Sequence, residues 1–166
     1  MNQNPTTATI FLQAVQAMVA TLQASPAVAP KVYRTRLRPL AQQDSTAVVV
    51  RLAGSDPDTS VGQGAVMVWG TAVSVECYAR GNTLAPADEA VDDLLARVYA
   101  RLQQDPSLGG VAGGVTPHSL SVDYDVDGDQ TACATVTMQI GRAVQQECRD
   151  RIVDLVCRLL LEKNFF

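Results

Sequence analysis

The sequence predicts an α+β fold in a single domain, with a mixed, largely antiparallel sheet and helices packed on one face of it. Two stretches, 6–24 and 86–104, carry apolar residues at helical spacing, and alternating or β-branched stretches lie between and after them. The order helix, strands, helix, strands is typical of α+β domains. The length of 166 residues fits one domain, and 47% apolar residues suffice for a sizeable core.

One helix and two extended segments are predicted first along the chain. Apolar residues three and four positions apart predict a helix over about 6–24, capped by Thr6 or Thr7 and ended by the prolines that follow. Residues 31–40 carry four basic side chains and lead to a proline, so we expect a short strand or an extended arm. The β-branched run 46–52 predicts a strand.

A loop, a long strand and a second helix are predicted next. Residues 53–64 are rich in Gly, Ser, Asp and Pro with few apolar anchors, which predicts a mobile loop. Alternation over 65–80 predicts one long strand with a nearly continuous buried face. Residues 86–104 combine an apolar stripe with an acidic start and a basic end, which suits the helix dipole. Asp93 and Arg97 add one favourable pair four residues apart.

A β-hairpin and a last helix complete the prediction. The strands cover about 120–126 and 132–140, and the Asp127-Gly128 step between them is a strong hairpin signal. In both strands apolar residues alternate with polar ones, so we expect one face of the hairpin to pack and the other to face water. Apolar spacing over 145–163 predicts a helix that follows the hairpin.

Composition and charge exclude several function classes. With a net charge of −4 and a pI near 4.8, the whole molecule is not built to grip nucleic acid. No apolar run approaches the ~20 residues of a membrane span, and the start of the chain lacks the basic segment of a secretion signal. We therefore expect an intracellular protein with no membrane partner. Four cysteines without a Cys-x-x-Cys pair are expected to be buried or half-buried free thiols: Cys77, Cys133, Cys148 and Cys157.

Three patterns that resemble ligand or catalytic sites lack the residues that the chemistry requires. The acidic run 123–129 imitates the start of a calcium loop, but Ala134 stands where a bidentate Glu is needed. The glycines of 109–114 lack the Lys-Ser/Thr pair of a phosphate loop and predict a flexible turn. The one histidine, His118, has no evident metal partner or nucleophile. We expect no catalytic residue, metal or cofactor, and a protein that is not an enzyme.

Two charged sets are candidates for function. The aspartate ladder consists of Asp123, Asp125, Asp127 and Asp129. It is either a solvated strand face or a functional electrostatic surface. The arginine segment consists of Arg34, Arg36 and Arg38, which an extended backbone would place on one side. It is either a charged edge that discourages wrong pairing or a salt-sensitive contact to an acidic partner surface, such as a neighbouring subunit's aspartate ladder.

Several segments between residues 5 and 141 form a recognisable order. They are Trp69-Gly-Thr, Val75-Glu-Cys-Tyr-Ala-Arg80, Ala87-Asp-Glu-Ala-Val-Asp-Asp-Leu-Leu95, Leu108-Gly109-Gly110, and the acidic strand with its partner Ala134-Thr-Val-Thr. This order resembles the tail terminator proteins (minor tail protein U, or tail completion proteins) of long-tailed bacteriophages. The resemblance implies a terminator-like α+β domain over 1–141, with 142–166 as a helical extension packed on or beside it.

The resemblance also implies a function and a set of partners. Such proteins form a hexameric ring that caps the completed tail tube, stops its polymerisation and presents a surface for the head connector. The implied partners are further copies of the chain, the tail tube protein and a head–tail connector or neck protein. The implied location is the tail–neck junction of the virion, with the host cytoplasm during assembly.

The charged sets take roles in a ring of this kind. DNA must slide through the lumen without specific binding, and negative walls repel phosphates, so we expect the aspartate ladder to face the lumen. The arginine segment and Arg80 are candidate contacts to a neighbouring subunit or partner. Two other classes stay open, namely a head-completion or connector adaptor of the same particle and a small ligand-binding domain or enzyme.

Overall fold

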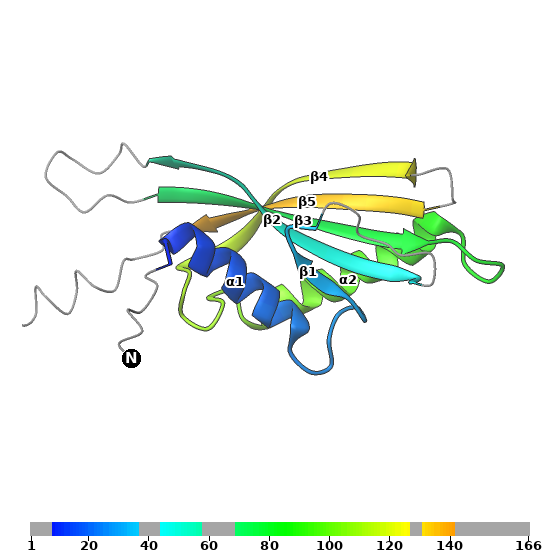
Figure 1. Cartoon of the computed structure of the whole chain (residues 1–166), viewed down its shortest axis with the longest axis horizontal. Coiled ribbons are helices and arrows are strands. Elements are labelled where there is room, and N and C mark those ends of the chain that lie inside the picture. The colour runs from blue at the N-terminus through cyan, green and yellow to red at the C-terminus, as the bar shows by residue number, and fades with distance from the viewer. Residues whose placement is uncertain (1–7, 37–43, 58–68, 127–130, 142–166) are drawn as a thin grey trace, which may run out of the picture.

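Five strands form one sheet and two helices lie against one of its faces in the computed structural model (Figure 1). The structure describes residues 8–36, 44–57, 69–126 and 131–141, and for residues 125 and 126 it describes the backbone alone. The elements are α1 Ile10–Gln23, β1 Val32–Arg34, β2 Thr46–Pro57, β3 Trp69–Arg80, α2 Ala87–Gln104, β4 Gly114–Val126 and β5 Thr131–Gly141. The helix predicted over 145–163 lies outside the described residues.

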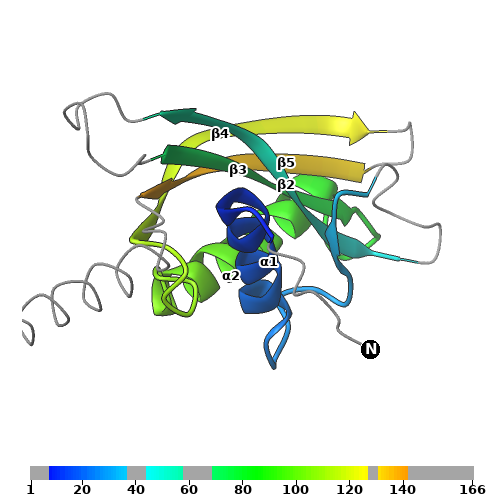
Figure 2. The same cartoon turned by 60° about the vertical axis from the view of Figure 1, so that its left-hand side comes forward.

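The sheet has the strand order β1-β2-β3-β5-β4. Only the β1–β2 pair is parallel among the described strands, and the other three neighbouring pairs are antiparallel. Both helices lie on the same side of the sheet, as two views of the molecule show (Figure 1 and Figure 2). The predicted fold class, an α+β domain with a mixed, largely antiparallel sheet, is confirmed.

Helix α1 starts later than its apolar spacing predicts. The Thr9 side chain accepts a hydrogen bond from the Leu12 amide at 3.3 Å and caps the helix. The cap predicted at Thr6 or Thr7 is therefore wrong, since the first helical residue is Ile10. The buried side chains of α1 recur at the expected spacing: Ala14, Val15, Met18 and Leu22.

Helix α2 agrees closely with its prediction. Pro86 precedes its first residue, acidic residues occupy the first turn, and Arg101 lies in the last turn. The predicted pair is present, with Arg97 Nη2 at 3.0 Å from Asp93 Oδ2. The stripe that packs on the sheet consists of Val91, Leu94, Leu95, Val98 and Leu102.

Strand β2 extends into the segment predicted as a loop. It continues to Pro57, whose partner on β3 is Trp69, so the loop prediction is wrong for residues 53–57. A register shift between Leu52 and Gly54 lets the irregular sequence stay paired. Pairing with β3 supplies the backbone hydrogen bonds that offset the weak strand propensity of Gly, Ser, Asp and Pro. The rest of the predicted loop lies outside the described residues.

Strand β3 crosses the centre of the sheet with one buried face, as predicted. The residues on that face that are at most 2% exposed are Thr71, Val73, Val75, Cys77 and Ala79. The thiols of Cys77 and Cys133 are free and buried, which confirms that prediction for two of the four cysteines. Cys148 and Cys157 lie outside the described residues.

The predicted hairpin is present, because β4 pairs with β5 in antiparallel register. Its packing is not as predicted. Leu120 and Val122 stand opposite Val136 and Ala134, which face the helices, yet they are 52% and 40% exposed. Two helices about 10 Å wide cover roughly four strands spaced ~4.8 Å apart, so the fifth strand, at the edge, is left uncovered.

Candidate functional site

The face of the sheet that carries no helix is mainly polar on β3, β4 and β5, whereas on β2 it carries the fully buried Ala47 and Val49. By strand alternation and register, the polar residues of this face in β3, β5 and β4 include Ser74, Glu76, Tyr78, Thr135, Thr137, Gln139, Ser121 and Asp123. The buried Cys133 lies on the same face, beside Tyr78. On β3 these side chains are half-buried, whereas their neighbours in the chain are fully buried under the helices. We call this surface the helix-free face.

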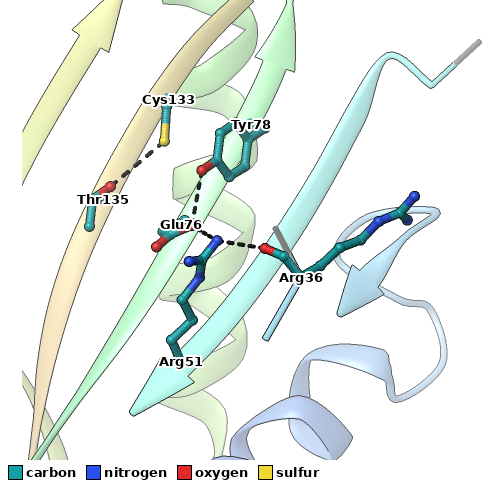
Figure 3. Close-up of polar contacts among 6 residues, drawn as sticks. All are labelled: Arg36, Arg51, Glu76, Tyr78, Cys133 and Thr135. Atoms are coloured by element: carbon teal, nitrogen blue, oxygen red, sulfur yellow. Dashed lines mark hydrogen bonds and ion pairs between the residues drawn. The ribbon is translucent and has the colours of Figure 1, made fainter. Parts of the chain in front are cut away.

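A polar cluster ties the helix-free face together near the β1 edge (Figure 3). Arg51 Nη2 lies 3.1 Å from Glu76 Oε2 and donates to the Arg36 carbonyl at 2.6 Å. The Tyr78 hydroxyl donates to Glu76 Oε2 at 2.9 Å. One arginine thus bridges β3 to the segment after β1, and the Glu76 carboxylate is already engaged by two partners. The cluster is built to hold strands together.

The Tyr78 hydroxyl and the Cys133 thiol near this cluster have raised pKa values. Burial, followed by the neighbouring Cys133 and the hydrogen bond to Glu76, raises the pKa of Tyr78. Burial raises the pKa of the Cys133 thiol as well. On the opposite face, burial raises the pKa of the Cys77 thiol to about 12. A thiol with a raised pKa is a poor nucleophile, so neither cysteine is suited to covalent catalysis.

The arginine segment does not present one side, contrary to the prediction. Thr35 has a φ of 52°, which ends the alternation of β1. Arg34 lines a pocket beside α1. The Arg36 guanidinium lies 4.1 Å from the Tyr33 ring, next to the polar cluster around Glu76. Arg38 lies outside the described residues. The two described arginines therefore serve different surfaces of the same edge.

The described members of the remaining charged sets lie far from that edge. Asp123 is exposed on the helix-free face of β4, at the opposite end of the strand order. Asp125 belongs to β4 by its backbone, and Asp127 and Asp129 lie outside the described residues. Arg80 is half-buried at the end of β3, with Thr131 as its cross-strand partner. Among the described residues, Asp123 therefore lies across the sheet from Arg34 and Arg36.

The described residues contain no metal-binding arrangement, because no three or more His, Cys, Asp or Glu side chains gather in them. His118 is exposed at a register shift between Pro117 and Ser119 of β4. The flanks of the acidic run are strands, which a calcium loop between helices does not have. Neither helix in this part of the chain is long and apolar enough to cross a membrane.

The glycine-rich stretch after α2 forms a turn, as predicted. Leu108, Gly109 and Gly110 have positive φ values of 50°, 70° and 85°. The Asp105 carboxylate accepts hydrogen bonds from the Ser107 hydroxyl at 2.6 Å and the Gly109 amide at 2.6 Å, and these bonds lower its pKa. The loop therefore uses its own carboxylate for the amides that a phosphate would need.

Two uncovered apolar surfaces were not predicted. The β4 strip consists of Leu120, Val122 and Tyr124. The α1 pocket, about 500 Å³ in volume, is lined by Thr9, Phe11, Leu12, Val15, Arg34, Thr35 and Leu52. In the sequence, the alternation of the β4 strip is the same as that of a covered strand. Which strand stays uncovered depends on the number and position of the helices, and the local sequence does not specify these.

Comparison with known proteins gives limited similarity. No protein-family model and no curated protein matches the sequence. A chain in the virion of a native gene transfer agent particle is 17% identical, with a TM-score of 0.46, over 80% of this chain and 95% of that one. The sheath/tube terminator of an extracellular contractile injection system is 13% identical, with a TM-score of 0.41, over 85% of this chain. The match covers 58% of that terminator chain. Likenesses of this extent assign no function.

Proposed function

We propose that this protein is a tail terminator subunit, a structural component of a phage-type particle. Six copies form a ring that caps the completed tail tube, stops its polymerisation and offers the surface to which the head connector joins. The partners are further copies of the chain, the tail tube protein and a connector or neck protein. The ring resides at the tail–neck junction of the virion, after assembly in the host cytoplasm.

The observation that carries this proposal is that helices cover one face of the sheet and leave the other without a helix. Both helices cover one face, and the helix-free face is polar across three strands. Its central carboxylate, Glu76, is engaged by Arg51 and Tyr78, so it is not free to act as an acid or base. A broad surface of this kind suits contacts with other proteins better than it suits a reaction. The element order that carries the terminator resemblance supports the same conclusion.

The electrostatics of such a ring determine how the subunit is oriented. DNA has to pass through the lumen, and a negative wall keeps its phosphates from binding. Asp123 is exposed on the helix-free face, so this face is the one that we propose to line the lumen. The other members of the aspartate ladder, Asp125, Asp127 and Asp129, are proposed to lie on the same wall. An assembled ring with Asp123 on its outer rim would contradict this orientation.

Imaging of particles assembled without this protein tests the function. A terminator limits tube growth, so tubes assembled in its absence are expected to have no uniform length and to lack heads. Adding the purified protein back should restore a uniform length. Tubes of normal length without heads would instead indicate a connector adaptor, and normal particles would exclude both roles.

A further inference from the structure

Most of the exposed large apolar side chains of the described residues fall into two groups at opposite edges of the sheet. Six such side chains are at least 39% exposed, and five of them belong to the α1 pocket or the β4 strip. Leu12 and Leu52 lie at the pocket, beside β1 and β2. The β4 strip lies at the far edge. An exposed apolar edge strand invites pairing with other chains, so a stable protein needs something to cover it.

The unpaired charges beside these groups have opposite signs. On the helix-free face, the Arg36 guanidinium stacks on Tyr33 and points away from Glu76, and it has no carboxylate partner within the described part of the chain (Figure 3). At the other edge, Asp123 follows Val122 in β4 and lies on the helix-free face. It likewise has no ion-pair partner among the residues described. Each edge therefore presents apolar groups towards the helix side and a charge towards the helix-free side, and the pocket edge also carries Arg34 on its helix side.

We propose that the β4 strip of one copy docks into the α1 pocket of the next copy, with Asp123 facing Arg36 across the boundary. The helix sides of the two copies then bury Val122 and its neighbours against Leu12 and Leu52, while the helix-free sides pair the two charges. Because the two surfaces differ, the contact is head-to-tail and repeats around an axis until it closes into a ring. This inference rests on the proposed ring and names the surfaces that build it.

The arrangement also agrees with the orientation proposed for the lumen. Head-to-tail contact along the two sheet edges keeps the helix-free faces of successive subunits on the same side of the ring. Asp123 then lies at the boundary between subunits on the lumen side. There Arg36 balances its charge, so the repulsion of DNA depends on the other members of the aspartate ladder. Removing apolar area from water supplies most of the affinity, whereas the charge pair contributes chiefly to register and specificity.

Complementation between two variants tests the contact. Leu52→Glu places a carboxylate in the pocket and Val122→Glu places one in the strip, and both positions are exposed enough to leave the subunit fold intact. Each change is expected to weaken self-association by at least about a hundredfold, because it replaces an apolar side chain of the contact with a carboxylate that must lose its water. Leu84→Glu is the matched control, since Leu84 is 93% exposed and belongs to neither surface.

Sedimentation velocity of the full chain, alone and mixed with purified tail tubes, reads out assembly. Wild type and Leu84→Glu should form the ring, and each pocket or strip variant alone should stay monomeric. An equimolar mixture of Leu52→Glu and Val122→Glu should form dimers and nothing larger, because one intact strip then meets one intact pocket. A monomeric mixture would contradict the pairing of the two surfaces.

The remaining outcomes separate failure of this contact from failure of the ring. If Leu52→Glu still forms the ring while Val122→Glu does not, the strip meets another surface, such as a second strip or the chain's own residues 142–166, and the inference is wrong. If both variants form the ring, the boundary lies elsewhere and only the proposed ring survives. If wild type and Leu84→Glu stay monomeric even on tubes, both proposals fail.

Charge exchange tests the polar half of the contact. Arg36→Glu and Asp123→Arg should each weaken association by about two- to fivefold at moderate salt, as expected for an exposed pair. The double variant should recover most of that loss, and high salt should remove the difference between wild type and the single variants. Additive losses in the double variant would show that Arg36 and Asp123 do not face each other.

Discussion

At the scale of single residues, arginines of α2 hold together parts of the chain that the helices alone would leave loose. Arg97 Nη1 donates to the Val28 carbonyl at 2.7 Å. Arg101 donates from Nη1 to the Ala24 carbonyl at 2.8 Å and from Nη2 to the Pro26 carbonyl at 2.5 Å. These bonds fasten the segment between α1 and β1 to α2. The planar guanidinium suits this role because it offers several donors in fixed directions.

Replacement of Arg101 by alanine should therefore destabilise the subunit. Loss of charged hydrogen bonds to Ala24 and Pro26 is expected to lower the free energy of unfolding by about 2 kcal/mol. Urea unfolding followed by circular dichroism measures this change. Arg101→Lys should fall between the variant and wild type, because an ammonium cannot span both carbonyls as well. An alanine variant as stable as wild type would mean that these bonds contribute nothing net.

Because the pKa of the buried Cys77 thiol is raised, we expect the free energy of unfolding to fall at alkaline pH. Its pKa rises from 9.0 to about 12 on folding because of burial, so the folded chain keeps a proton that the unfolded chain releases. Its contribution is complete below pH 9.0 and is lost as the pH rises towards about 12. Over that range the slope from this group is at most about 1.4 kcal/mol per pH unit. Cys77→Ala should show a shallower decline in urea unfolding, and identical declines would contradict the assignment.

At the scale of elements, the sequence is informative where one helix or strand decides its own burial. The stripe of α2 and the buried face of β3 follow from spacing alone, and both are confirmed. Residues 53–57 were wrongly predicted as a loop because strand pairing, which is not local, overrides propensity. The exposure of Leu120 could not be predicted from its own strand, since it depends on where the helices lie. The placement of Arg34 and Arg36 on different surfaces could not be predicted either, since it depends on the φ of Thr35.

Truncation of two leucines measures this difference between covered and uncovered strands. Leu94 of α2 is fully buried, so Leu94→Ala should cost about 2–5 kcal/mol of unfolding free energy. Leu120 of β4 is 52% exposed, and Leu120→Ala should cost less than about 1.5 kcal/mol in the monomer. Urea unfolding at low protein concentration gives both values. Equal costs would mean that β4 is covered in the isolated subunit.

At the scale of the whole molecule, the core lies between the helices and one face of the sheet, and other surfaces carry exposed side chains. The helices and the helix-covered sheet face enclose the core, while exposed side chains remain on the helix-free face of β4, in the β4 strip and at the α1 pocket. The described residues place charged and apolar groups on those surfaces, and no metal-binding cluster lies among them. That distribution supports the proposed function, which is performed by contact in a ring at the end of a tail tube.

The most direct test is electron microscopy of purified tail tubes mixed with the purified protein. A terminator should appear as a six-fold ring at one end of each tube, and further tube subunits should no longer extend that end. A protein that leaves both ends bare, or that binds an end without stopping its growth, would contradict the central claim.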